Sequence, residues 1–211
     1  MKTGMPTAKP LVRGSIEVIT GSMFSGKTEE LIRRLRRAEL AGLQVLIFKP
    51  EFDKRYGMDA VVSHNQNRIP CYNIHHSKQI TEYVRDNFPS NSSGNTTGMV
   101  IGVDEAQFLD EDIVKVAQQL SYHHHRVLLA GLDMDFLGQP FGPMPALMAV
   151  ADEVTKVRAI CSECGLEASH SYRHTSLQST RVLGAQEHYK PLCRSCFNQA
   201  MDEQKSEPSF F

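Results

Sequence analysis

A glycine-rich segment that ends in lysine and threonine carries the strongest chemical signal in the chain. Residues 21–28 read Gly-Ser-Met-Phe-Ser-Gly-Lys-Thr and match the phosphate-binding pattern G-x-x-x-x-G-K-[ST]. Gly21 and Gly26 permit backbone angles and a close approach that a Cβ would obstruct. Backbone N–H groups can then surround phosphates, while Lys27 supplies a positive charge and the Thr28 hydroxyl can ligate Mg²⁺. The predicted ATP- and phosphate-binding residues of this loop are Gly21, Ser22, Met23, Phe24, Ser25, Gly26, Lys27 and Thr28.

Two consecutive acids follow an apolar run and form the second half of the predicted nucleotide site. Residues 99–103 are apolar and are followed by Asp104 and Glu105. A carboxylate at the carboxyl end of a strand beside a phosphate loop is well placed to hold Mg²⁺. Since successive strand residues point to opposite sides, one acid can face a metal while the other faces a substrate hydroxyl. The alternative is that the pair simply ends a strand in solvent.

Four of the five cysteines form two pairs with the spacing of metal ligands. They are Cys161 with Cys164 and Cys193 with Cys196. Two such pairs can close a tetrahedral S₄ site for Zn²⁺, and a closed site of this kind is structural. A redox Cys-x-x-Cys motif would explain one pair but not two. Cys71 stands apart, and we interpret it as a small buried hydrophobic residue.

The elements that must position these residues alternate between strands and helices. Alternation of this kind predicts an α/β fold with a parallel sheet covered on both faces. The predicted strands are residues 16–20, 45–48, 99–103, 127–132 and 154–160, and the predicted helices are residues 29–41, 77–87 and 112–120. The predicted domains are a flexible tail at 1–13, a nucleotide-binding domain at 14–160, a zinc-binding domain at 161–200 and a second tail at 201–211.

Composition limits the classes of partner. The 211 residues carry a net charge of −1, so no global field attracts nucleic acid. The N-terminal segment lacks the apolar region of a secretory signal, and no apolar run approaches a membrane span, so a cytoplasmic protein is expected. The arginines between residues 33 and 37 predict the solvated face of a helix, with phosphate or subunit binding as the alternative. Residues 123–125, three histidines, predict a solvated turn, with metal binding as the alternative.

Taken together, the motifs resemble the type II thymidine kinases, a family shared by bacteria, animals and poxviruses. The resemblance covers roughly residues 14–197 and depends on the order and joint presence of its motifs. These are the phosphate loop, Asp53-Lys54-Arg55-Tyr56, Asp104-Glu105-Ala106-Gln107-Phe108, Gly131-Leu132-Asp133-Met134-Asp135-Phe136, Pro140-Phe141-Gly142 and the four cysteines. The resemblance implies a RecA-like α/β domain that carries a small zinc-binding lasso domain.

The resemblance also implies roles for individual residues. Glu105 matches the general base that takes the proton of the nucleoside 5′-hydroxyl, and Asp104 matches the strand-end acid near Mg²⁺. Asp53 and Arg55 match a loop that organises Mg²⁺ and phosphate. The implied thymidine-binding residues are Met23, Gln107, Phe108, Leu132, Phe136 and Phe141, joined by Thr180, Val182, Leu183, Gly184 and Tyr189 of the lasso loop. The implied ligands are ATP and thymidine, with dTTP as a feedback inhibitor, and the implied assembly is a homotetramer.

Two other classes of protein share some of these features. A RecA-like nucleic-acid-dependent ATPase would share the phosphate loop and the strand-end acids, but the chain lacks a stripe of basic and aromatic residues. A nucleotide-binding regulator without catalysis would not need a base at Glu105. From the aromatic residues alone, Phe108, Phe136 and Phe141 would be interpreted as core packing.

Overall fold

The computed structural model describes residues 12–51, 60–62, 68–88, 98–174 and 188–206. Its centre is a six-stranded sheet in which every pairing is parallel, with the order β5-β2-β6-β7-β1-β8. The predicted α/β class with a parallel sheet is therefore confirmed. The strands are β1 (Ser15–Thr20), β2 (Val45–Pro50), β5 (Tyr72–Ile74), β6 (Val100–Val103), β7 (Arg126–Gly131) and β8 (Glu153–Lys156).

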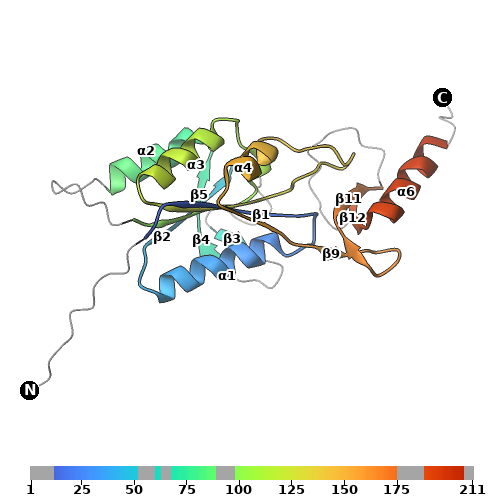
Figure 1. Ribbon diagram of the computed structural model, residues 1–211, viewed down its shortest axis with the longest axis horizontal. Helices are drawn as coiled ribbons and strands as arrows, with labels where there is room; N and C mark the ends of the chain where they lie inside the picture. Colours follow the sequence, from blue (N-terminus) through green and yellow to red (C-terminus); the bar gives the residue numbers. More distant parts are fainter. Residues whose placement is uncertain (1–11, 52–59, 63–67, 89–97, 175–187, 207–211) are drawn as a thin grey trace, which may run out of the picture.

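Helices cover both faces of this sheet. Helix α1 (Lys27–Leu40) lies on one face, and α2 (Lys78–Asn87), α3 (Ile113–Tyr122) and α4 (Met144–Val150) lie on the other (Figure 1). Side chains of one strand alternate between the two cores, as Leu128 packs on the α1 side while Leu129 packs on the opposite side. Cys71 is buried in the α1-side core, as predicted.

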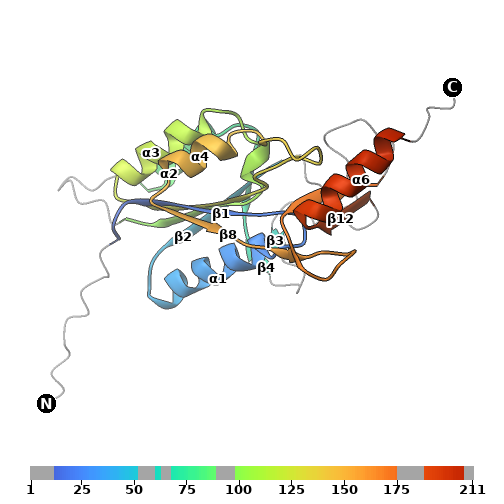
Figure 2. The same cartoon turned by 45° about the vertical axis from the view of Figure 1, so that its right-hand side comes forward.

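A smaller, C-terminal module lies at the carboxyl end of the sheet, beyond the start of α1 (Figure 2). Strand β9 (Ala159–Ile160) pairs antiparallel with β10 (Glu167–Ala168), and β11 (His170–Arg173) pairs antiparallel with β12 (Tyr189–Leu192). Helix α6 (Arg194–Ser206) packs on them through Phe197, whose ring stacks on His170 at 4.6 Å. We call residues 159–174 and 188–206 the zinc module, after the zinc site that its cysteines predict.

Two predictions about elements need correction. The single strand predicted at 154–160 is wrong, because β8 ends at Lys156 and β9 belongs to a different sheet. The last contact of this segment with the main sheet is the hydrogen bond from the Val157 N–H to the Thr20 carbonyl, at 2.8 Å. Thr20 directly precedes the phosphate loop, and the chain leaves the main sheet after Val157. The tail predicted at 201–211 begins too early, because α6 continues to Ser206.

Several elements have no counterpart in the predictions. Besides α4 and β5, they include the hairpin of β3 (Ala60–Val62) and β4 (Arg68–Pro70) and the 3-10 helix η2 (Ala106–Phe108). All are short, so their periodicity is weak. Within the described ranges, no helix is long and apolar enough to cross a membrane.

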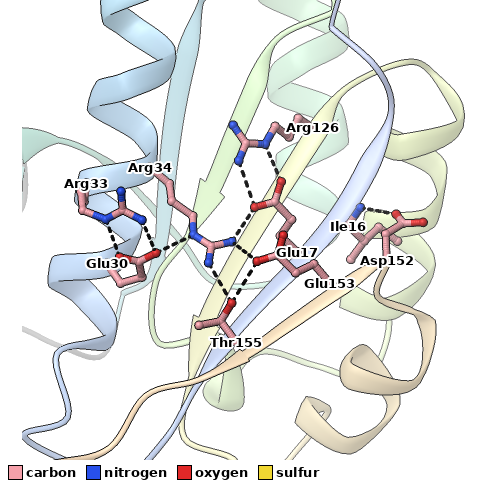
Figure 3. A network of polar contacts seen from close by, with 9 residues as sticks. All are labelled: Ile16, Glu17, Glu30, Arg33, Arg34, Arg126, Asp152, Glu153 and Thr155. Carbon is pink, nitrogen blue, oxygen red and sulfur yellow. Dashed lines mark hydrogen bonds and ion pairs between the residues drawn. The ribbon is translucent and has the colours of Figure 1, made fainter.

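The arginine-rich face of α1 is solvated only in part. Arg33 has a side chain that is 53% exposed, but that of Arg34 is only 11% exposed, so the prediction is wrong for Arg34. Its guanidinium donates to Glu17 of β1 at 2.7 Å, to Glu30 at 2.8 Å and to Thr155 of β8 at 2.8 Å (Figure 3). The buried carboxylate of Glu17 on the neighbouring strand draws this arginine inward.

The histidine turn also departs from its prediction at one position. His125 is 2% exposed, and its Nδ1 accepts the N–H of Met99 at 3.2 Å. The backbone of β6 begins here and needs an acceptor for this amide, which explains why the last of the three histidines is buried.

Candidate functional site

The phosphate loop lies between β1 and α1, at the carboxyl end of the sheet. Gly21 has φ 149°, and a Cβ there would lie 2.2 Å from the Val157 carbonyl oxygen, so only glycine fits. Gly26 has φ 86° and precedes the first residue of α1. The nearest atom to a Cβ at Gly26 would be 3.9 Å away, so the backbone here borders open space in which a phosphate can approach the helix N-terminus.

Inside the loop, the Ser22 carbonyl holds two side chains. It accepts a hydrogen bond from Lys27 Nζ at 2.7 Å and another from Ser25 Oγ at 2.7 Å. Burial lowers the pKa of Lys27, although the nearby carboxylates of Glu105 and Asp104 favour its charged form. An anion beside this ammonium would restore the favourable interactions that burial removes.

Thr28 and Asp104 bring two oxygen donors together from α1 and the end of β6. The Thr28 hydroxyl donates to the carboxylate of Asp104 at 3.2 and 3.3 Å. Asp104 is 7% exposed, and burial together with the negative charge of Glu105 raises its pKa to about 7. Hydroxyl and carboxylate oxygens are the ligands that Mg²⁺ prefers, and a cation would offset the cost of burying this carboxylate. These residues therefore fit a magnesium ion.

Glu105 points to different partners from Asp104. Its backbone has φ 54°, which is unusual for a residue with a side chain and places it at the start of η2. Its Oε2 accepts a hydrogen bond from Gln107 Nε2 at 2.6 Å. Strained backbone of this kind is concentrated at functional sites because the surrounding structure must enforce it.

The residues expected around thymidine fall into two groups at the same end of the sheet. Phe108 and Phe141 meet edge to face with ring centroids 5.4 Å apart. Phe136 lies under the guanidinium of Arg173, whose Cζ is 3.5 Å from the ring centroid. Tyr189 of β12 is opposite Arg173 in the β11–β12 pair. Asp53, Arg55, Thr180, Val182, Leu183 and Gly184 lie outside the described residues.

The phosphate loop is attached to the zinc module. The N–H of Met23 donates to Ser171 Oγ at 2.9 Å, and Ser171 belongs to β11. Phe24, with φ 63°, packs against the apolar core of the same module. Sequence reasoning missed Ser171 and Arg173 because a polar strand between two cysteine pairs resembles an ordinary surface strand.

An ion pair at the ends of β7 and β8 was also missed. Asp133 is 6% exposed and forms an ion pair with Lys156. Its negative charge also favours the charged form of Lys27. Asp133 lies in a quoted motif, but its sequence context does not reveal the partner from another strand.

The four paired cysteines converge in the zinc module. One ligand atom from each of Cys161, Cys164, Cys193 and Cys196 lies within 4.8 Å of the others, and all four thiols are free. The Cys164 and Cys193 sulfurs are 3.7 Å apart. Tetrahedral Zn–S bonds of ~2.3 Å require sulfurs ~3.8 Å apart, so the cluster fits a zinc ion.

Comparison with known proteins gives one consistent result. A family model described as thymidine kinase matches residues 14–197. A protein of Porphyromonas gingivalis named thymidine kinase is 50% identical over 200 residues, which cover 95% of this chain and 93% of the relative. Proteins of the same name from Bacteroides fragilis and a Rhodothermus species are 49% and 48% identical. The alignment with the Bacteroides fragilis protein covers 92% of both chains. The alignment with the Rhodothermus protein covers 87% of this chain and 81% of the relative.

Proposed function

The chain belongs to the thymidine kinase family, and on that premise we propose that it transfers the γ-phosphoryl group of ATP to the 5′-hydroxyl of thymidine. The observation that carries the proposal is the convergence of Lys27, Thr28, Asp104 and Glu105 at one end of the sheet. A phosphoryl transfer requires positioned phosphates, a metal and a group that orients the attacking hydroxyl, and these four residues supply the corresponding chemistry.

The phosphate loop binds and orients the triphosphate. Amides at the start of α1 donate to phosphate oxygens. Lys27 gives up its hydrogen bond to the Ser22 carbonyl and donates to the outer phosphates instead. In that position its charge stabilises the negative charge of the transition state. Thr28 and Asp104 would hold Mg²⁺, with Asp53 as the further magnesium-linked residue that the resemblance implies. The ion neutralises phosphate charge when bound.

Glu105 is the general base of the proposed reaction. Its carboxylate accepts the proton of the 5′-hydroxyl as that oxygen attacks the γ-phosphorus and ADP leaves. Support comes from its position next to Asp104 and from its separate partner: Glu105 accepts the Gln107 amide, whereas Asp104 accepts the Thr28 hydroxyl.

The thymidine-binding residues would come from both parts of the chain. Phe108, Phe136 and Phe141 would surround the nucleoside, together with Met23 and Leu132. By resemblance, backbone groups of the lasso loop, residues 180–189, would read the edge of the base. The four cysteines would hold a structural zinc that anchors both ends of this loop.

The remaining expectations also belong to this proposal. The chain would act as a cytoplasmic homotetramer inhibited by dTTP, with neither nucleic acid nor membrane as a partner. Its kinase domain would span residues 14–160 after a tail at 1–13, and its lasso domain would begin at residue 161 and include α6, which continues to Ser206.

The variant Glu105→Gln tests the proposed base because it keeps the size of the side chain but removes the proton acceptor. A positioned base contributes ~10²–10⁴-fold, so turnover should fall by about that factor while binding of a non-hydrolysable ATP analogue persists. Glu111→Gln is the matched control, since Glu111 is exposed on the following segment, and it should leave turnover unchanged. Near-normal turnover of Glu105→Gln would reject this residue as the base.

A further inference from the structure

We propose that Gln107 is a positioning residue that fixes the carboxylate of Glu105 and links it to the segment expected to bind thymidine. The inference deepens the proposed function and rests on Glu105 being the base. It assigns to Gln107 a role that acts through another residue, in place of the direct substrate contact implied by the resemblance.

The side chain of Gln107 uses both ends of its amide. Its Nε2 donates to Glu105 Oε2 at 2.6 Å, and its Oε1 accepts the backbone N–H of Leu132 at 3.0 Å. Leu132 directly follows β7, so one side chain joins the predicted base to the beginning of the predicted nucleoside-binding segment. The two bonds also define which amide atom is nitrogen, because only the nitrogen can donate to a carboxylate.

Close packing holds Gln107 in this position. The residue is 2% exposed. A Cβ at Gly131 would lie 2.7 Å from Gln107 Oε1, and a Cβ at Gly142 would lie 2.3 Å from its backbone oxygen. The two glycines therefore leave space that the glutamine occupies. A buried side chain with so little room and two satisfied ends has few other rotamers available.

A fixed carboxylate has a direct consequence for the transfer step. Glu105 Oε2 is engaged by the amide, so Oε1 is the oxygen available to the 5′-hydroxyl. During the reaction the O–H bond breaks, its proton moves to Oε1, the 5′-oxygen bonds to the γ-phosphorus and ADP leaves. Because effective catalysis requires reacting atoms to be aligned within a narrow range, free rotation of the carboxylate would reduce the rate.

Two variants separate the two bonds of Gln107. Gln107→Met has a similar length but lacks both the donor and the acceptor. Gln107→Glu retains an acceptor for Leu132, but beside Glu105 it can donate only while its carboxyl group is protonated, so this variant is assayed across a range of pH. Gln107→Met should lower kcat by ~10–10²-fold with little change in KM for thymidine, as expected for lost alignment, and Gln107→Glu should lose kcat relative to the wild type as the pH rises. Gln118→Met on the exposed face of α3 is the matched control and should retain wild-type kcat.

A double-mutant cycle distinguishes positioning from a general structural effect. If Gln107 acts through Glu105, then Gln107→Met should change kcat by less than about twofold in a Glu105→Gln background, because the group it orients is already lost. An equal loss in both backgrounds, or wild-type kcat for Gln107→Met, would overturn the inference. A normal kcat for Glu105→Gln alone would instead reject the proposed base, so the two failures can be told apart.

Discussion

The clearest test of how the fold is held together concerns Arg34, which joins α1 to two strands of the sheet. We expect Arg34→Met to destabilise the protein, because methionine retains an apolar stem but provides no partner for the buried carboxylate of Glu17. The side chains of Arg34 and Glu17 are 11% and 10% exposed, so their 2.7 Å ion pair is largely shielded from water (Figure 3).

The size of the effect follows from what remains after the substitution. Removing one partner of a buried ion pair costs ~3–5 kcal/mol. Glu17 keeps two hydrogen bonds from Arg126, at 2.5 and 3.0 Å, and Glu30 keeps its ion pair with Arg33. We therefore expect a decrease in the free energy of unfolding of ~2–3 kcal/mol, at or below the lower end of that range.

Arg33→Met is the matched control on the same helix. Arg33 pairs with Glu30 at 2.6 Å, but its side chain is 53% exposed, and exposed ion pairs contribute little to stability. Urea unfolding of both variants, repeated at 1 M NaCl, provides the measurement. Salt should diminish the Arg33 effect and leave most of the Arg34 effect, since buried pairs are screened less. Equal losses in the two variants, or a neutral Arg34→Met, would refute the reasoning.

Three further perturbations have defined outcomes. Burial, with repulsion from neighbouring histidines, lowers the pKa of His125 from 6.5 to about 4. As the pH falls, this histidine therefore binds a proton in the unfolded chain before it does so in the folded one. The free energy of unfolding should decrease by up to ~3 kcal/mol between pH 6.5 and 4. In the variant His125→Gln, the free energy of unfolding should depend less on pH in that interval. Elemental analysis of the wild type should find about one zinc ion per chain, and Cys193→Ala should abolish it. The same variant should weaken binding of an ATP analogue because Ser171 supports the phosphate loop, and an unchanged affinity would argue against that support. Lys27→Ala should reduce kcat strongly without lowering Tm, because the buried ammonium is retained for the ligand and not for the fold; a clear loss of Tm would contradict this.

The parts of the fold that the sequence predicts are those encoded by neighbouring residues. The strand before the phosphate loop, the helix after it and the apolar run before Asp104 each have a local pattern, and all three elements exist within a few residues of the predicted bounds. The cysteine spacing likewise predicts a cluster that the structure brings together. These patterns can be recognised in the sequence because the buried apolar residues of each element recur with the period of a helix or a strand.

The features that escaped prediction depend on contacts between distant segments. In sequence, Arg34 looks as solvated as the neighbouring Arg33, Arg36 and Arg37, and only the crossing of α1 over β1 reveals its buried partner. The bond between Gln107 and the Leu132 amide joins the ends of two strands, and the support of the phosphate loop by Ser171 spans most of the chain. The break after β8 was missed because β9 continues the same strand-like composition while pairing elsewhere.

The measurement that tests the central claim most directly is product formation from a panel of nucleosides. The protein is incubated with ATP, Mg²⁺ and thymidine, deoxyuridine or deoxycytidine in turn, and the nucleoside monophosphate is quantified by chromatography. We predict dTMP from thymidine, a kcat/KM for deoxyuridine that is ~10–200-fold lower because one methyl is missing, and a value for deoxycytidine that is ~10⁴-fold lower because its hydrogen-bonding edge is reversed. Absence of monophosphate from every nucleoside, with ATP hydrolysis appearing only when DNA is added, would contradict the account.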